Sequence, residues 1–277
     1  MANKTGIQWC DSTLNLQMGC DGCELWGERN QPNTCYAGAI TLAINDQGGN
    51  PHFPSVFNHP VIYPERAKYI QEWSDLTGKD RNDKPWLSGY PRMIFLNDMG
   101  DTFTKELDLH WLDEFIPQME ESPHIYLMLT KRVRRMTTFW QEYGRVPNNI
   151  WLGTTVTKNM NLNRARELMT IPAATHFVSF EPLLESVELR DVRPEWVIVG
   201  FESGRQSREG SPLWMRRLRD ECSEREIPYF VKQMGGWSDH KGRMEDIPED
   251  LRIRDVPKWN HLSWKGKTPP SFKQVSF

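Results

Sequence analysis

Residues 125–156 read IYLMLTKRVRRMTTFWQEYGRVPNNIWLGTTV. This stretch begins and ends with short, nearly continuous apolar runs, Ile125–Thr130 and Ile150–Val156. Such runs are typical of parallel strands that are covered on both faces. Between them, large apolar residues recur at the spacing of one helical face: Met136, Phe139, Trp140 and Tyr143. The stretch therefore predicts a strand, a helix and a second strand parallel to the first.

The same alternation covers most of the chain. A second helical stripe is Trp111, Leu112, Phe115, Ile116 and Met119, and Ser211 with Pro212 is a helix start that precedes a helix over Trp214–Arg225. Five further strands are expected at Ile7–Cys10, Met93–Asn97, His176–Glu181, Trp196–Glu202 and Tyr229–Gln233. Seven strands alternating with helices favour an α/β fold that is a complete or partial TIM-like (β/α) barrel, over a doubly wound sheet.

The length of 277 residues fits one large domain with additions. We expect residues 1–235 to form the barrel and residues 236–277 to form a C-terminal extension or cap. Residues 46–64 and 74–92 are rich in Gly, Asn, Asp and Pro and are expected to form a long excursion between the first two strands.

Composition excludes several classes of protein. No apolar run approaches the roughly 18 residues of a membrane helix, and the N-terminus has no apolar leader, so we expect a cytoplasmic protein without a membrane partner. The 12 Trp and 12 Phe exclude a disordered chain. With a net charge of -3, nucleic acid would have to be bound through a local basic patch.

The cysteines give the sharpest chemical signal. Cys20, Cys23 and Cys35 lie in the segment GCDGCELWGERNQPNTCYAG, residues 19–38, and the pair C-x-x-C can direct two sulfurs to one metal. Thiolates select zinc or iron–sulfur iron over hard cations. Three thiolates on a [4Fe-4S] cluster leave one iron open to bind a substrate or cofactor.

Two other interpretations of the cysteines stay open. A structural zinc site would need a fourth ligand, for which Cys10 is available, and the protein would then be a non-catalytic nucleic-acid-binding protein. A redox C-x-x-C pair is less favoured, because no thioredoxin-like unit surrounds it. Cys222 follows Trp214 and Leu218 at four-residue steps and is expected to be a core residue.

Polar residues gather where the predicted strands end, which is where barrels of this topology carry their chemistry. Asp98 and Asp101 can accept hydrogen bonds from an ammonium group, and Lys131 with Arg132 can pair with a carboxylate. Glu181 and Glu202 suit a ribose or a second amine. S-adenosylmethionine is an amino acid joined to a nucleoside and would use all of these partners. The residues expected to contact it are Tyr36, Asp98, Met99, Gly100, Asp101, Lys131, Thr155, Ser179, Glu181 and Glu202.

These motifs resemble the radical S-adenosylmethionine superfamily, and within it a phage-associated three-cysteine subgroup. The likeness covers roughly residues 5 to 240 and rests on the following segments: Gly19-Cys20…Cys35-Tyr36-Ala37, Leu129-Thr130-Lys131-Arg132, Ser179-Phe180-Glu181-Pro182-Leu183, Val199-Gly200-Phe201-Glu202-Ser203-Gly204 and Phe230-Val231-Lys232-Gln233. The cysteine spacing departs from most of the superfamily, because two and then eleven residues separate the cysteines instead of three and then two.

The resemblance implies an enzyme that cleaves S-adenosylmethionine to a 5′-deoxyadenosyl radical, supplied with electrons by a donor such as flavodoxin. In the phage subgroup it implies an isomerase that converts 5-N-α-glycinylthymidine to 5-C-α-glycinylthymidine in DNA, acting in the host cytoplasm. A lyase or repair enzyme for a thymine lesion is the alternative within the same chemistry.

A modified base in duplex DNA would have to turn out of the helix to be reached. Arg132, Arg134 and Arg135, which begin a predicted helix, are expected to bind the DNA phosphates, and Lys265, Lys267 and Lys273 add positive charge to the tail. Trp26 and Tyr36 are candidates to stack on the base.

Overall fold

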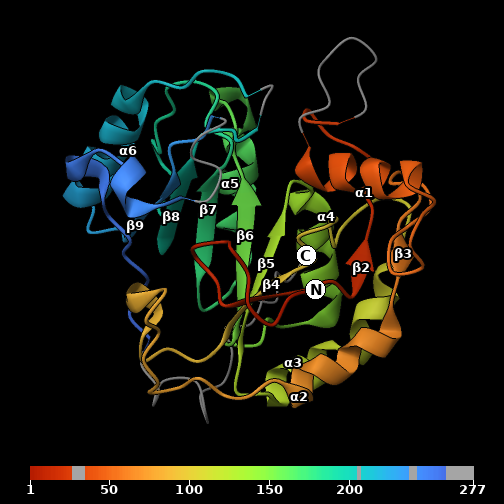
Figure 1. The fold of residues 1–277 in the computed structure, drawn as a ribbon. Helices are drawn as coiled ribbons and strands as arrows, with labels where there is room; N and C mark the ends of the chain where they lie inside the picture. The colour runs from red at the N-terminus through yellow and green to blue at the C-terminus, as the bar shows by residue number, and fades with distance from the viewer. Residues whose placement is uncertain (27–34, 205–206, 237–241, 260–277) are drawn as a thin grey trace, which may run out of the picture.

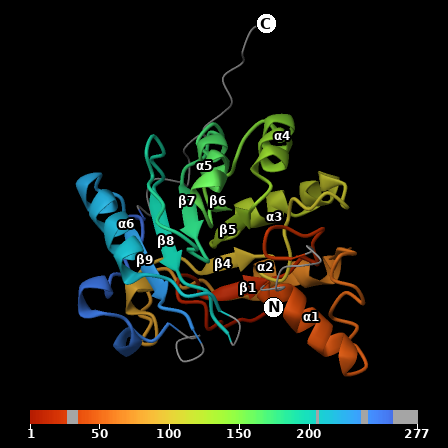
Figure 2. The same cartoon turned by 90° about the horizontal axis from the view of Figure 1, so that it is seen from above.

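The computed structural model describes residues 1–26, 35–204, 207–236 and 242–259. Its centre is a sheet of seven parallel strands: β1 (Ser12–Leu14), β4 (Met93–Leu96), β5 (Ile125–Thr130), β6 (Ile150–Thr155), β7 (His176–Phe180), β8 (Trp196–Gly200) and β9 (Tyr229–Gln233). The order of strands across the sheet follows the order along the chain, with no reversal. The sheet is therefore wound in one direction and curls into a half-barrel, as Figures 1 and 2 show. The predicted partial barrel is confirmed over the doubly wound alternative, which requires a reversal of strand order.

Helices cover the convex side of this sheet, as seen from above in Figure 2. They are α3 (Ile116–Glu121), α4 (Val133–Tyr143), α5 (Leu162–Leu168) and α6 (Pro212–Glu224). Alternate strand residues such as Ile94, Tyr126 and Val197 pack against them in two buried clusters. The predicted α6 begins after Ser211 as expected, and Cys222 is fully buried on its inner face, as predicted.

The other set of alternate residues lines the concave side. Near the amino ends of the strands this lining is aromatic: Trp9, Phe95, Trp151, Phe177, Trp196 and Phe230. Gly153 allows this packing, because a Cβ there would lie 2.2 Å from the ring of Phe177. Aromatic rings therefore fill the amino end of the half-barrel, and the inward-facing residues nearer the carboxyl ends are smaller or polar.

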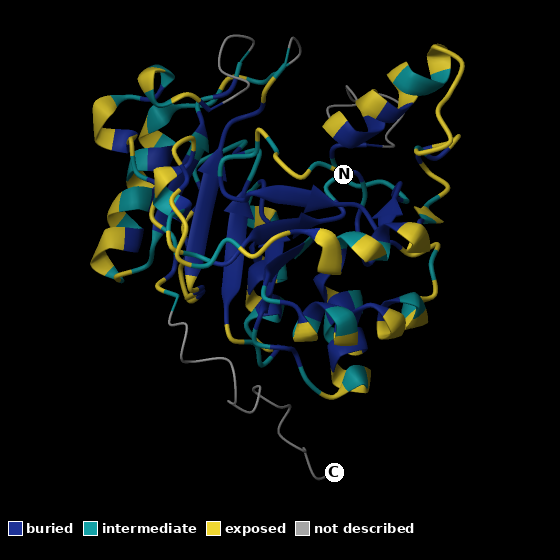
Figure 3. Cartoon of the chain, turned by 60° about the horizontal axis from the view of Figure 1, so that its bottom comes forward, coloured by how far each residue is buried: buried dark blue, intermediate teal, exposed yellow. Residues whose placement is uncertain are grey.

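The excursion between β1 and β4 carries its own elements. They are β2 (Gln17–Met18), α1 (Tyr36–Asp46), β3 (Val61–Ile62), the 3₁₀ turn η1 (Pro64–Lys68), α2 (Tyr69–Glu72) and the turn η2 (Pro85–Leu87). β2 and β3 form a small antiparallel pair. Figure 3 shows the sheet as buried, whereas much of α1 is exposed.

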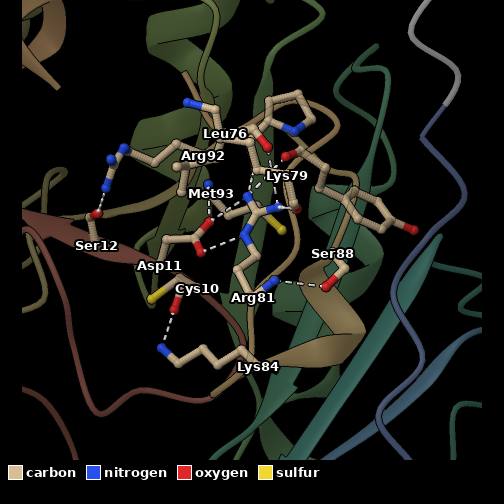
Figure 4. A network of polar contacts seen from close by, with 12 residues as sticks. Cys10, Asp11, Ser12, Leu76, Lys79, Arg81, Lys84, Ser88, Arg92 and Met93 are labelled. Carbon is tan, nitrogen blue, oxygen red and sulfur yellow. Dashed lines mark hydrogen bonds and ion pairs between the residues drawn. The ribbon is translucent and has the colours of Figure 1, made fainter. Parts of the chain in front are cut away.

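Buried cations fix the second part of the excursion to the amino end of the sheet (Figure 4). The Arg81 guanidinium donates to both carboxylate oxygens of Asp11, at 2.9 and 3.2 Å, and also to four backbone carbonyls. The Lys84 ammonium donates to three backbone carbonyls, and burial lowers the pKa of this ammonium. Because every buried charge is matched by acceptors, the network can exist in the interior.

The prediction of the first strand at Ile7–Cys10 is wrong. Pairing with β4 starts one residue after Cys10, where the Asp11 amide donates to Met93, and β1 is Ser12–Leu14. Trp9 and Cys10 belong instead to the concave aromatic cluster. Ser12 is fully buried although it is polar, because its hydroxyl donates to the Asn3 carbonyl. Two of the three residues of β1, Ser12 and Thr13, are polar, so the strand gives no continuous apolar signal in the sequence.

Several predicted boundaries also shift. The stripe at residues 111–119 is divided between the 3₁₀ turn η3 (Leu109–Glu114) and α3, because Pro117 near the start of α3 cannot donate to the preceding turn. The strand at Met93–Asn97 ends one residue early, where Asn97 adopts a positive φ of 57°. The strands predicted to reach Val156, Glu181 and Glu202 end at Thr155, Phe180 and Gly200.

The C-terminal residues 242–259 pack on the last strand. The Val231 amide donates to the Ile253 carbonyl, and Ile247 and Leu251 join the outer core of α6 and β9. Lys265, Lys267 and Lys273 lie outside the described residues. Among the described residues, no helix has both the length and the apolar character to cross a membrane.

Candidate functional site at the carboxyl end of the half-barrel

Residues 19–26, the described part of the cysteine segment before Cys35, lie against the loops at the carboxyl ends of the strands. The Gly19 amide donates to the Met99 carbonyl at 3.0 Å, which pairs this segment with the loop after β4. Gly100 permits the close approach, because a Cβ there would lie 2.7 Å from both the Gly19 carbonyl and the Gln17 side chain. The absence of a side chain at Gly100 thus lets the cysteine segment pack against the loop after β4.

Arg132 ties this segment to the sheet. Its guanidinium donates to Asp101 at 2.8 Å, contacts Asp21 and donates to the Gly22 carbonyl. Asp101 also accepts hydrogen bonds from Thr130 and from backbone amides, so all of its acceptor capacity is used within the protein. The side chain of Arg132 is only 11% exposed. Both residues were predicted to meet ligands, and both lie at the site, where they join the loops after β4 and β5 to the cysteine segment.

Glu24 provides a second anchor. Arg164 of α5 donates to both of its carboxylate oxygens, at 2.8 and 3.1 Å, and the Thr157 hydroxyl lies 3.3 Å away. Burial works to raise the pKa of Glu24, but the Arg164 hydrogen bonds and the charges of Lys131 and Arg164 outweigh it and lower this pKa to about 2. Glu24 is therefore a permanent anion that holds the segment to the loop after β6.

Cys20 and Cys23 lie in the described part of the segment before residue 27, and Cys35 directly precedes α1. Burial raises the pKa of Cys20 to about 12, aided by Asp101, and burial likewise raises the pKa of Cys35. Cys35 is the N-cap of α1. Within the described parts of the chain, no three His, Cys, Asp or Glu side chains are gathered closely enough to hold a metal ion.

Comparison with known proteins places the chain in a family. Residues 4–268 match the model of the family described as "Protein of unknown function (DUF5131)". The chain belongs to this family. Neither the curated proteins nor the solved structures contain a match to it. The matched range includes the cysteine segment and all seven strands of the sheet.

The thiols of Cys20, Cys23 and Cys35 in this DUF5131 chain are donors of the soft type that zinc and iron–sulfur clusters take. Arg132 acts to lower the pKa of Cys20, and Lys131 that of Cys35, but burial outweighs both. Residues 27–34, between Cys23 and Cys35, lie outside the described residues. Cys10 packs with Trp9 and Phe95 in the concave cluster, and the largest charges on it come from Lys84 and Asp11. This position disfavours Cys10 as a fourth ligand to the other three.

Tyr36, the first residue of α1, reaches the loop after β4. Its hydroxyl donates to the Asp98 carbonyl, and the charges of Asp98, Cys35, Cys10 and Glu181 all act on it. The residue as a whole is nevertheless 51% exposed. The carboxyl group of Asp98 is held by Asn15 at 2.7 Å, and burial raises its pKa.

An ion pair crosses the concave face on the other side. Lys232 of β9 lies 3.0 Å from the Oε1 atom of Glu181, and Ser179 donates to Oε2 of the same carboxylate at 3.1 Å. Gly200 of β8 makes room for this carboxylate, because a Cβ there would lie 2.8 Å from Oε1. Oε1 is buried, and the Lys232 ammonium at 3.0 Å is its partner among the described residues. The pair therefore presents a cation and a carboxylate side by side.

The remaining predicted residues are distributed more widely. Thr155 is buried at the carboxyl end of β6, and Met99 packs with Cys20 and Trp26. Glu202 accepts three hydrogen bonds from Arg208, which occupy its carboxylate. Trp26 is buried against Phe57.

The three arginines predicted to bind DNA have different surroundings. Arg134, in the first turn of α4, is exposed, whereas Arg132 is engaged as described above. Arg135 donates to the Leu107 carbonyl and lines an open hollow on the outer side of α4, away from the concave face.

Sequence reasoning missed four anchoring residues: Asp21, Glu24, Thr157 and Arg164. The acidic residues inside the cysteine segment were visible as charges, but their partners lie as far as 140 residues away. Lys232 was noted only as part of a strand end. Its pairing with Glu181 follows from the inward alternation on β9.

Proposed function

We propose that this chain is a radical S-adenosylmethionine enzyme whose [4Fe-4S] cluster is held by Cys20, Cys23 and Cys35. The observation that carries the proposal is the anchoring of the cysteine segment. Arg132 and Arg164 hold it across the carboxyl ends of a singly wound half-barrel, so a cluster there would face the concave side. When bound, the cluster supplies the electron for reductive cleavage of S-adenosylmethionine.

The chain's own residues would orient this cofactor. Tyr36 offers an aromatic face for the adenine, and Lys131 offers a cation to the carboxylate. Glu181, Asp98 and the carbonyls beside Gly100 offer acceptors for the amine and the ribose. The aromatic floor of Trp9, Phe177 and Trp196 keeps water out of the amino end of the half-barrel.

For the substrate, the motif likeness supports an amino-acid-modified thymidine in phage DNA. We propose the isomerisation of 5-N-α-glycinylthymidine to 5-C-α-glycinylthymidine. The reaction would take place in the host cytoplasm, with flavodoxin or a similar protein as electron donor. It is redox-neutral, because the hydrogen taken from the glycine Cα is returned after the migration.

Formation of 5′-deoxyadenosine tests the cofactor assignment. The protein is purified without oxygen, reconstituted with iron and sulfide, reduced and mixed with S-adenosylmethionine. Cys20→Ala, Cys23→Ala and Cys35→Ala should each abolish both the brown colour and 5′-deoxyadenosine. Cys222→Ala and Cys10→Ala, which remove thiols outside the segment, should retain both. Colourless protein that binds one zinc per chain would overturn the assignment in favour of a structural zinc protein.

The nucleoside product tests the substrate assignment. DNA that contains glycinylthymidine is incubated with the active enzyme and digested to nucleosides. A product with the same mass and a different retention time supports the isomerase. Release of thymidine would support a lyase instead, and an unchanged nucleoside beside abundant 5′-deoxyadenosine would show that the substrate is a different one.

A further inference from the structure

Met160 is the most exposed large apolar side chain among the described residues, at 79%. It lies in the 3₁₀ turn η4 (Asn159–Asn161), which follows β6 at the carboxyl end of the sheet. Because this side chain buries so little surface within the chain, it adds little to folding. A single exposed apolar residue is ordinary on a protein surface, so its local setting decides whether it has a role.

The backbone on both sides of Met160 is pinned. The Asn159 amide donates to Glu185 at 2.7 Å, and its side chain donates to Glu185 at 3.0 Å and to the Ser186 carbonyl at 2.7 Å. On the other side, the Thr157 hydroxyl donates to the side chain of Asn161 at 2.9 Å. The turn is thus rigid while the thioether points outward, which lowers the entropy cost of inserting it into a partner.

Positive charge lies at the same end of the sheet as this apolar tip. Lys158 directly precedes the turn, and Arg134 is exposed in the first turn of α4, which follows the neighbouring strand β5. Neither side chain forms an ion pair with a described residue. A rigid apolar tip next to a cation suits duplex DNA, where cations contact the phosphates and an apolar side chain enters between bases.

We propose that Met160 is a wedge that enters the base stack of duplex DNA and fills the space left when the modified thymidine turns toward the concave face. The inference rests on the proposed function and adds that the substrate is duplex rather than single-stranded DNA. Met suits this task, because its unbranched, polarizable side chain adapts to irregular gaps between flat rings.

The test compares Met160→Ala and Met160→Leu with the wild type on one glycinylthymidine oligonucleotide in three forms. These are a matched duplex, a duplex with a mismatch opposite the modified base, and a single strand. Met160→Ala should lower kcat/KM on the matched duplex by roughly tenfold or more. Its kcat/KM should be partly restored on the mismatched duplex and should equal that of the wild type on the single strand. Met160→Leu should remain close to the wild type. An equal loss on all three forms, or no loss on the matched duplex, would overturn the wedge.

A second readout separates this inference from the proposed function. The fluorescence of 2-aminopurine placed beside the target base in a duplex rises when the stack opens, whether or not the enzyme turns over. The wild type should raise it and Met160→Ala should not, while iron content and 5′-deoxyadenosine formation without DNA stay unchanged. If the protein lacks iron, the proposed function fails while the fluorescence still tests the wedge. If the wild type binds the duplex without a rise in fluorescence, the wedge fails while the cluster assignment stands.

Discussion

The two ends of the half-barrel differ in how completely their cations are paired. At the amino end, Arg81 and Lys84 are buried and surrounded by Asp11 and backbone carbonyls that use their donors. At the carboxyl end, Glu24 and Glu202 are paired with arginines and Glu181 with Lys232, but the Lys131 ammonium forms no ion pair with a described residue. The amino end is therefore built for stability, and the carboxyl end keeps the Lys131 cation available for a ligand.

The largest expected effect comes from breaking the amino-end network. Arg81→Met leaves the Asp11 carboxylate buried without its cation and should lower the free energy of unfolding by about 3–5 kcal/mol. Urea denaturation measures the change. Arg166→Met, which breaks the exposed pair with Asp191, is the control and should leave the stability nearly unchanged. A small effect of Arg81→Met would show that the network is not the main support of this end.

His124, at the amino end, should make the stability of the protein depend on pH. Burial, with the nearby charge of Arg92, lowers its pKa from 6.5 to about 4, so the folded state favours the neutral ring. Below pH 6.5 the unfolded state binds a proton on His124 that the folded state does not bind. The free energy of unfolding should therefore fall by about 3 kcal/mol between pH 6.5 and 4 because of this residue. The free energy of unfolding, measured by denaturation at several pH values, should change less across this range for His124→Gln than for the wild type. An equal slope in the two proteins would contradict the assignment.

Two glycines on the concave face separate stability from function. Gly153→Ala places a Cβ 2.2 Å from the Phe177 ring in the aromatic floor and should cost about 1–3 kcal/mol of stability. Gly200→Ala places a Cβ 2.8 Å from Glu181 at the carboxyl end. It should change the melting temperature little while slowing 5′-deoxyadenosine formation roughly tenfold or more. If both variants lost only stability, the division between the two ends would be wrong.

The smallest effect is expected from Arg134, the exposed cation in the first turn of α4. Arg134→Gln should weaken duplex binding a few-fold and reduce the slope of log affinity against log salt by about 1. Fluorescence anisotropy at several salt concentrations measures both quantities. Arg145→Gln, whose guanidinium pairs with Glu120 before β6, is the matched control and should leave the slope unchanged. If both variants behaved alike, Arg134 would have no phosphate contact.

Much of the fold could be predicted, because parallel strands covered on both faces are nearly continuous apolar runs. Ile125–Thr130 and Trp196–Gly200 gave this signal, whereas β1 did not, because Ser12 and Thr13 are polar residues that are buried with hydrogen-bond partners. The motif spacing indicated the carboxyl-end site. It could not reveal that Asp101 and Arg132 hold the cysteine segment, because such pairs depend on how distant loops meet in space.

Cys20, Cys23 and Cys35 are proposed to hold a cluster with one iron open to S-adenosylmethionine. Electron paramagnetic resonance of the reconstituted, reduced protein detects both the cluster and its open iron. We predict a [4Fe-4S]⁺ signal that changes when S-adenosylmethionine is added and that disappears in each of the three alanine variants. A signal that S-adenosylmethionine leaves unchanged, or the absence of any cluster signal in the reconstituted wild type, would contradict the account.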